Sequence, residues 1–311
     1  MEMKTEKIVR RVNELFHDFT NKEYEEMTHR DMLKKERLRW EKAKKYLEKN
    51  KSIRILDIGS GAGFVPLTIA NVFKERDVFI CSDVSKIMLN TTKNNIKKEK
   101  FKCKFRYVKL NSEQFPFKDE SVDLITTNSV LHHVHNTKNF LYEIDRILKK
   151  DGILIIGHEP NIRFAENKIL IYINHLLSLI FTPKEELKFV SVRLGIFDIL
   201  DKLSGFINLK RKRIVSEREK LAEKISEILK RENLIKDNLS IGEIMSLVDY
   251  KTVGFDPFNL IPRYWVLYIE TYHHLRGFEY NKEKFLRKYS ESLKEKYPLD
   301  GRTFFVILKK P

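Results

Sequence analysis

Residues 55–64 read ILDIGSGAGF, a short apolar run followed by three glycines at alternate positions. A run of this length that ends at glycine is typical of a buried strand leading through a tight turn into a helix. Glycine lacks a Cβ, so Gly59, Gly61 and Gly63 allow the backbone to turn sharply and to approach a ligand closely. Because open parallel sheets bind ligands at the carboxyl ends of their strands, this turn is expected to lie in a ligand site.

The chain around this turn alternates between strands and helices from residue 53 to residue 158. Apolar runs predict the strands, and apolar residues at helical spacing among charges predict the helices. Such alternation indicates right-handed βαβ units and a doubly wound, mostly parallel α/β sheet with helices on both faces. The predicted strands cover residues 53–58, 78–83, 105–110, 122–127 and 153–157, and the predicted helices cover residues 63–73, 86–98 and 138–149.

The flanking segments differ in character from this central part. Residues 1–50 are predicted to form an N-terminal helical extension near the ligand site, because apolar residues recur there at helical spacing. Residues 161–250 read as helices without a clear strand, whereas residues 251–311 end in the strand-like run TFFVIL at 303–308. We therefore expect one sheet domain built from residues 51–160 and 251–311, with a helical cap inserted at 161–250.

The net charge of the chain limits the kinds of partner that the protein is expected to bind. The chain has 311 residues, with 60 Lys or Arg and 44 Asp or Glu, which gives a formal net charge of +16. Such a charge can indicate nucleic acid, a membrane surface or an anionic substrate. The lysines are spread along the chain and mixed with glutamates, which is typical of solvated helix faces, so nucleic acid is the less favoured partner.

The location of the protein is predicted from its cysteines and apolar runs. Cys81 and Cys103 have no metal-binding spacing, and the charged N-terminus has no signal-peptide pattern. A reducing, cytoplasmic location is therefore expected. The most apolar stretch, at 169–181, is too short for a transmembrane helix, which needs ~20 residues.

Two acids beside the glycine turn discriminate between ligands. The spacing is GxGxG, with Phe64 where a dinucleotide-binding turn has its third glycine. Asp57 ends the preceding strand, and its carboxylate would repel a pyrophosphate but suits the cationic amino group of a methionine moiety. Asp83 ends the next predicted strand, where an acid can accept hydrogen bonds from both ribose hydroxyls or can be an ordinary turn residue. The ribose interpretation is favoured because it agrees with the turn.

Three further motifs follow in order: LNSEQFPFKDESVDLI at 110–125, NSVLHHV at 128–134 and ILKKDGILII at 147–156. With the glycine turn and the second strand, they resemble the ordered motifs of class I S-adenosylmethionine-dependent methyltransferases. The resemblance is to the small-molecule type 11 branch, which includes quinone methyltransferases, and it covers residues 50–160. It implies a Rossmann-like fold, S-adenosylmethionine as cofactor, S-adenosylhomocysteine as product, and an antiparallel place in the sheet for the strand at 303–308.

The resemblance also implies roles for individual residues. The methionine end would lie against groups that follow the first and fourth strands, and the adenine against groups that follow the second and third. The family has Asp where this chain has Asn111, whose amide oxygen can still accept from the adenine amino group. The implied cofactor residues are Asp57, Gly59, Ser60, Gly61 and Gly63 at the methionine end, Asp83 at the ribose, Val84, Met88, Asn111 and Ser112 at the adenine, and Asn128 beside the methionine.

A group of histidines contains the candidates for a catalytic role in methyl transfer. Methyl transfer requires alignment of the acceptor with the methyl group and exclusion of water, and it requires a base only when the acceptor must lose a proton. Four histidines near the expected ends of the fourth and fifth strands could pack a structural turn, act as a base, or hold a metal that orients a catechol-like acceptor. The structural alternative is favoured, and no bound metal is expected. The histidines are His132, His133, His135 and His158, and the catalytic candidates are His158, its neighbour Glu159, and His133.

The sequence thus predicts a methyltransferase that acts on a small, apolar or aromatic metabolite bound under the cap at 161–250. The basic charge keeps an RNA or protein methyltransferase as an alternative, although no NPPY-like or catalytic-cysteine signature is present. A cofactor-binding protein without catalytic activity is a third interpretation. Aromatic residues also gather at 258–272, where they could line a pocket or pack the last strands.

Overall fold

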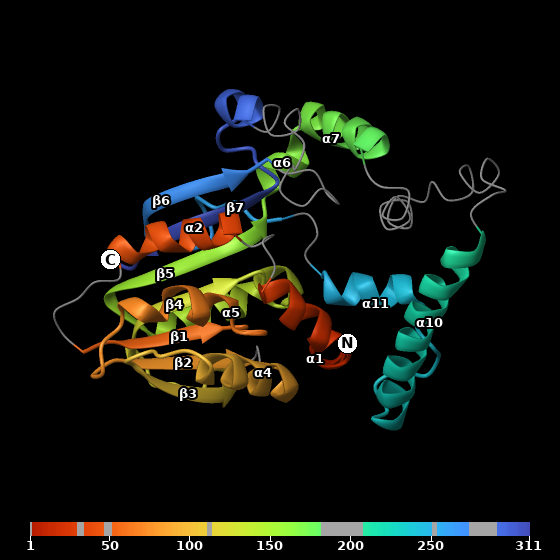
Figure 1. Cartoon of the computed structure of the whole chain (residues 1–311), viewed down its shortest axis with the longest axis horizontal. Helices are drawn as coiled ribbons and strands as arrows, with labels where there is room; N and C mark the ends of the chain where they lie inside the picture. Colours follow the sequence, from red (N-terminus) through yellow and green to blue (C-terminus); the bar gives the residue numbers. More distant parts are fainter. Residues whose placement is uncertain are drawn as a thin grey trace.

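The computed structural model describes residues 2–29, 34–46, 52–110, 114–181, 208–250, 254–273 and 291–311. Within these residues, seven strands form one sheet in the order β3-β2-β1-β4-β5-β7-β6 (Figure 1). The strands are β1 (Arg54–Ile58), β2 (Val78–Asp83), β3 (Lys104–Lys109), β4 (Val122–Asn128), β5 (Leu148–Pro160), β6 (Trp265–Tyr272) and β7 (Thr303–Lys309). The main helices are α1 (Glu2–His29), α2 (Lys34–Ala43), α3 (Phe64–Ile69), α4 (Lys86–Lys97), α5 (Thr137–Ile147), α6 (Ile162–Glu166), α7 (Lys168–Phe181), α10 (Asn208–Arg231) and α11 (Ile241–Val248).

The sheet has the expected doubly wound topology. Strands β1 to β5 run parallel, and β1 pairs with both β2 and β4, so the strand order reverses at β1. Strand β7 lies between β5 and β6 and is antiparallel to both. The Rossmann-like fold and the antiparallel return of the last strand are therefore confirmed, and the reversal point marks where a ligand is expected to bind.

The inner strands are apolar along most of their length because helices cover both faces of the sheet. Ile55 and Ile155 lie in one core, against α3 and α4, and both are fully buried. Leu56 and Ile125 are equally buried in the other core, against α5. These two cores hold the strands rigidly, so the residues at the carboxyl ends of the strands have fixed positions.

Most predicted boundaries differ from the observed ones by one or two residues, and two elements differ by more. The helix predicted at 63–73 is divided into α3 and the 3-10 turn η3 (Ala70–Val72). Strand β5 begins at Leu148 rather than at Ile153, because Leu148 already pairs with Val122 of β4. Neither difference moves the carboxyl ends of the strands, where the candidate site lies.

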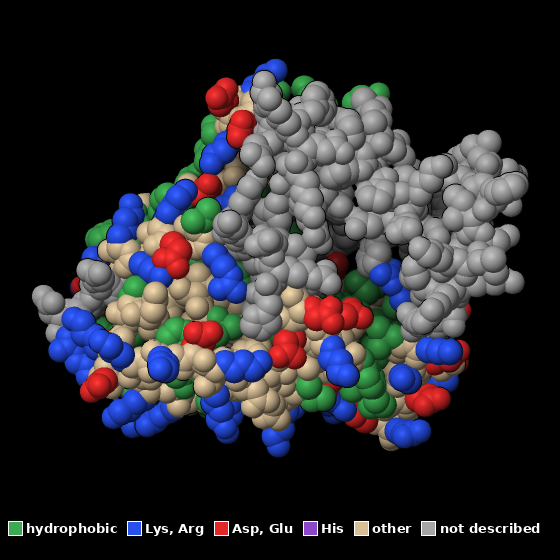
Figure 2. Space-filling model, viewed as in Figure 1, with side chains coloured by type: hydrophobic (Ala, Val, Ile, Leu, Met, Phe, Trp, Pro, Cys, Tyr) green, Lys and Arg blue, Asp and Glu red, His purple; other side chains and the backbone are tan. Residues whose placement is uncertain are grey.

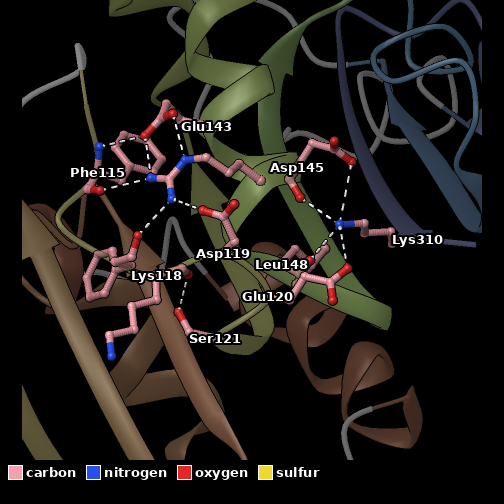
Figure 3. A network of polar contacts seen from close by, with 11 residues as sticks. Phe115, Lys118, Asp119, Glu120, Ser121, Glu143, Asp145, Leu148 and Lys310 are labelled. Atoms are coloured by element: carbon pink, nitrogen blue, oxygen red, sulfur yellow. Dashed lines mark hydrogen bonds and ion pairs between the residues drawn. The ribbon is translucent and has the colours of Figure 1, made fainter.

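The amino ends of β4 and β5 are held by two cations, the half-buried Arg146 and the buried Lys310 (Figure 3). Arg146 donates to the carboxylates of Glu143, at 2.7 Å, and Asp119, at 2.6 Å. Lys310, which follows β7, donates to the carbonyl oxygen of Leu148 at 2.7 Å. The contacts fix α5 and the last strand at the end of the sheet away from the glycine turn, so this network supports the fold rather than the site.

Helix α1 packs against α10 and α11 in a core of their own. Val12 is fully buried there, and Arg11 forms an ion pair with Glu232 whose closest atoms are 2.6 Å apart. The segments 1–50 and 161–250, expected to be separate helical parts, thus share one core. The boundaries expected for the cap and the extension stay a prediction.

Helix α2 belongs to the sheet domain instead, and Figure 1 shows it lying across β5 and β7. Trp40 is buried, and its ring lies edge-on to Phe305 of β7 with 5.1 Å between the ring centroids. The aromatic run at 258–272 forms β6 and the turn before it. Tyr264 is buried there, and its hydroxyl donates to Asp145 at 2.9 Å, so this residue packs the end of the sheet.

The distribution of charged side chains on the surface agrees with the prediction that the lysines lie on solvated helix faces. Figure 2 shows Lys and Arg side chains spread over the described part of this face and interspersed with Asp and Glu. Among the described helices, none is both long enough and apolar enough to cross a membrane. Cys81 and Cys103 are buried free thiols.

Candidate cofactor and acceptor site

The glycine turn is fixed to the neighbouring strand by its backbone. The N–H groups of Gly59 and Ser60 both donate to the carbonyl oxygen of Ser82 at 2.8 Å. Gly59 has φ +73°, and a Cβ at this position would lie 2.3 Å from Cγ2 of Val130. Only glycine fits there, because the left-handed conformation and the close approach each disfavour a side chain.

Gly61 differs from Gly59 because its outer face is open. Its φ is +53°, and a Cβ built on it would meet no heavy atom within 4 Å. Its N–H donates to Oδ2 of Asp83 at 2.9 Å, and its carbonyl oxygen accepts from Oγ1 of Thr92 at 2.6 Å. The peptide is therefore held from both sides while space remains beside it, as a turn that cradles a ligand requires.

Asp57 lies buried beneath the turn. Its Oδ2 accepts from Oγ of Ser60 at 2.7 Å, and its Oδ1 accepts from Oγ1 of Thr126 at 2.7 Å. The side chain is 1% exposed, and burial raises the pKa of this carboxyl to about 7. The turn is thus braced by a carboxylate, and the implied contact of Asp57 with the methionine amino group stays a prediction.

Asp83 ends β2 and faces the turn. Its Oδ1 accepts from the N–H of Ser85 at 2.9 Å, and its Oδ2 accepts from the N–H of Gly61. Burial raises the pKa of the Asp83 carboxyl to about 6. The backbone of Val84 also donates to this carboxylate, so a ribose hydroxyl would share its remaining acceptor capacity with three backbone donors.

The structure describes two of the four residues that the resemblance places at the adenine. Met88, on the first turn of α4, is buried, and its N–H is capped by Oγ of Ser85 at 2.9 Å. Val84 is half-buried beside it. Asn111 and Ser112 lie outside the described residues.

Helix α1 covers the end of β2 and the start of α4. Asp18 accepts a hydrogen bond from Oγ of Ser85, and Asn21 accepts from Oγ1 of Thr91 at 2.8 Å. Because Ser85 also holds Asp83, the N-terminal helix is tied to the candidate ribose position. The expectation that this extension lies near the ligand site is supported by these contacts.

Asn128, at the end of β4, is positioned by α2. Its Oδ1 accepts from Nε1 of Trp40 at 3.3 Å. A Cβ on Gly157 would lie 2.5 Å from the same oxygen, so glycine at 157 makes room for the amide. Trp40 gave no sign of this role in the sequence, because tryptophan at helical spacing normally indicates only packing.

Glu159 holds the loop that carries the histidines. Its carboxylate is fully buried and accepts from the N–H groups of Val130, at 2.6 Å, Leu131, at 2.8 Å, and His132, at 3.3 Å. It also contacts Nδ1 of His132 at 2.8 Å. His158 has φ +54°, and the register of β5 against β7 shifts at this point, which directs Glu159 toward the loop.

The four histidines separate into distinct surroundings. His132 and His133 lie together with 4.0 Å between ring centroids, and Nδ1 of His133 is 2.7 Å from the carbonyl oxygen of Val248. His135 lies against Tyr250, whereas His158 stacks on Tyr272 of β6. Burial lowers the pKa of His133 well below its ordinary value, so its ring is neutral.

Two partners of this pair were missed by sequence reasoning. His17 of α1 lies edge-on to His133 with 5.3 Å between centroids, and burial lowers the pKa of His17 to about 4. Oδ1 of Asp249, at the end of α11, is 3.9 Å from Nε2 of His132 and 4.0 Å from Nδ1 of His133. More than 100 positions separate each of these residues from the histidine pair, so no local motif could reveal them.

Comparison with known proteins identifies the central part of the chain. Residues 56–156 match a family described as "Methyltransferase domain". They form a class I S-adenosylmethionine-dependent methyltransferase domain. The glycine turn, Asp83 and the histidine loop all lie within or at the edge of this match.

Two curated relatives are each similar to this chain over 40% of its length or less. The ubiquinone/menaquinone biosynthesis C-methyltransferase UbiE of Vibrio vulnificus (strain YJ016) is 29% identical over 103 residues, which are 33% of this chain and 40% of that protein. The uncharacterized methyltransferase YcgJ of Bacillus subtilis (strain 168) is 32% identical over 125 residues, which are 40% of this chain and 46% of that protein. This chain therefore spans less than half the length of either relative.

Two solved structures are also similar to parts of this chain. A methyltransferase from Aquifex aeolicus described as dependent on S-adenosylmethionine is 26% identical, with a TM-score of 0.34, over 38% of this chain and 62% of that chain. The crystal structure of YcgJ from Bacillus subtilis is 16% identical with a TM-score of 0.42, over 87% of this chain and 97% of that chain.

The raised pKa of Asp83 predicts that the affinity of the methyltransferase domain for its cofactor depends on pH. Because burial raises this pKa to about 6, the carboxyl is protonated below that pH and ionised above it. Only the ionised form offers both oxygens as charged acceptors. We expect the affinity for S-adenosylhomocysteine, measured by calorimetry, to rise by up to about tenfold between about pH 5 and pH 7. The Asp83→Asn variant should show a weaker dependence, of which the rest is due to Asp57 with its pKa of about 7. An equally steep profile in the variant, or a flat profile in the unmodified protein, would contradict the assignment.

Proposed function

We propose that this protein transfers the methyl group of S-adenosylmethionine to a small, apolar or aromatic metabolite. The observation that carries the proposal is the open face of Gly61 beside the buried carboxylate of Asp83. A Cβ on Gly61 would fill this space, and the Asp83 carboxylate keeps acceptor capacity for a hydroxyl group beside its three backbone donors. Both features fit a nucleoside with free ribose hydroxyls.

The residues around the turn would hold the cofactor as the family resemblance implies. Asp83 would accept from the ribose hydroxyls, and Val84 and Met88 would lie against the adenine. Asn128, fixed by Trp40, would line the methionine side. When bound, S-adenosylmethionine supplies a methyl group that its sulfonium already activates, so the task of the chain is to align the acceptor and exclude water.

The acceptor would approach from the histidine loop, beneath α1 and α11. This part of the site combines the neutral ring of His133 with the apolar core shared by α1, α10 and α11. We propose that these helices cap the acceptor, as the sequence predicted for residues 161–250. The similarity to a quinone C-methyltransferase supports an acceptor of aromatic character.

The catalytic candidates receive different roles in this proposal. A neutral His133 can take a proton from an acceptor that must lose one. Glu159 already accepts three backbone N–H groups and contacts His132, so we propose that it positions the loop rather than takes a proton. His158, stacked on Tyr272, stays a second candidate for a polar contact with the acceptor.

A labelling experiment tests the proposed substrate class. The purified protein would be incubated with S-adenosylmethionine carrying a deuterated methyl group, together with an extract of small molecules, total RNA or total protein. We expect the label in apolar small molecules, and no label with the Asp83→Ala variant. Label found only in RNA or protein would overturn the proposed substrate, and no transfer to any fraction would argue for a binding protein without catalytic activity.

A further inference from the structure

We propose that His132, His133 and Asp249 form a binding site for a divalent transition-metal ion of the zinc type. Each of the three residues offers one ligand atom, and these atoms all lie within 4.8 Å of one another. The three side chains are half-buried, so an ion can reach them and still be shielded from bulk water. Two imidazoles and one carboxylate are a donor set that zinc and iron sites use in proteins.

The buried carboxylate of Glu159 orients His132 for this role. Its Oε2 is 2.8 Å from Nδ1 of His132, and it also accepts the N–H of the same residue. A carboxylate acceptor places the proton on Nδ1 and leaves Nε2 as the ligand atom. Histidines that bind metals usually make such a contact through their second nitrogen, so this feature points independently to a ligand.

The ring of His133 is oriented by a hydrogen bond from its Nδ1 to the end of helix α11. The carbonyl oxygen of Val248, 2.7 Å from Nδ1 of His133, can only accept a hydrogen bond, so the proton of a neutral ring lies on Nδ1. Val248 ends α11 and Asp249 follows it directly. One helix end therefore supplies both the group that orients His133 and the carboxylate ligand.

The three ligand atoms, which lie within 4.8 Å of one another, must approach one another further to hold an ion. Oδ1 of Asp249 is 3.9 Å from Nε2 of His132, whereas two ligand atoms of a tetrahedral zinc ion are separated by about 3.4 Å. The carboxyl groups of Asp249 and Glu159 lie on either side of the His132 imidazole, near Nε2 and Nδ1 respectively. An ion held by three protein groups retains a position for water or, if the proposed function holds, for an oxygen of the acceptor, and in this metal-bound state Nε2 of His133 is a ligand and does not act as the base.

Cobalt provides a spectroscopic test that needs neither cofactor nor acceptor. The full chain, freed of metal by a chelator, would be titrated with cobalt chloride, and the visible absorption of bound cobalt would be recorded before and after addition of zinc. We expect saturable absorption with one ion per chain, displaced by zinc. The Asp249→Asn variant, which preserves side-chain shape, should bind cobalt about 10- to 100-fold more weakly or not at all.

His135→Gln is the matched control, since His135 lies in the same loop but outside the three-residue cluster. Its cobalt affinity should equal that of the unmodified protein. Equal binding by the unmodified protein and Asp249→Asn, or no saturable absorption by the unmodified protein, would overturn the site. Calorimetry with S-adenosylhomocysteine on the same samples distinguishes this failure from a failure of the proposed function, because the cofactor site does not include these side chains.

Discussion

Replacement of Asp83 with Ala should weaken the binding of S-adenosylmethionine by about 100-fold or more, because two hydrogen bonds from ribose hydroxyls to a charged acceptor contribute about 1.5–3 kcal/mol each. The same change removes the acceptors for the N–H groups of Gly61 and Ser85, which hold the turn. Calorimetric titration of the purified variant measures the effect directly.

Asp77 provides a matched control for this variant. It is buried at the opposite end of β2, where its carboxylate accepts from the N–H groups of Ile53, at 3.0 Å, and Lys74, at 2.7 Å. Asp77→Asn should lower the thermal midpoint and leave the affinity for the cofactor unchanged. If both variants lost affinity equally, the effect of Asp83→Ala would reflect a damaged fold and not a lost contact.

Substitution of the two turn glycines with Ala should separate folding from binding. Gly61→Ala places a Cβ in open space, so its cost to the free energy of unfolding is the left-handed conformation alone, about 1–2 kcal/mol. The same methyl group occupies the space proposed for the cofactor, and the affinity should fall by about 10- to 100-fold.

Gly59→Ala should mainly reduce the stability of the fold. Its Cβ would lie 2.3 Å from Cγ2 of Val130, and this overlap adds about 1–3 kcal/mol to the conformational cost. Thermal unfolding should therefore show a larger loss of stability for Gly59→Ala than for Gly61→Ala. An unchanged cofactor affinity in Gly61→Ala would show that the open face of the turn is not where the ligand binds.

The strands of the sheet could be predicted from the sequence because each strand is specified by its own residues and by the turn that follows it. The run at 55–58 and the glycines after it specify a strand and a turn, and similar runs repeat along the chain. Helix and strand ends were less well predicted, since β5 extends back to Leu148 only through its pairing with β4. That pairing depends on the neighbouring strand and not on the residues of β5 alone.

The cluster of His132, His133 and Asp249, on the proposed acceptor side, could not be predicted because its residues meet only in the folded chain. Asp249 reaches His132 because α11 packs on α1, and the residues of that core are separated by about 200 positions. Glu159 was predicted as a catalytic residue, but the sequence could not show that the carboxylate is buried beneath the histidine loop. Backbone hydrogen bonds of this kind leave no pattern in the residue types.

The turn from Asp57 to Gly63 is proposed to bind S-adenosylmethionine beside Asp83. Calorimetric titration of the unmodified protein with S-adenosylmethionine measures this binding. We expect one site per chain, with a dissociation constant in the range of about 1 μM to 1 mM that is usual for enzyme substrates. No measurable binding at millimolar cofactor, or equal binding by the Asp83→Ala variant, would contradict the claim.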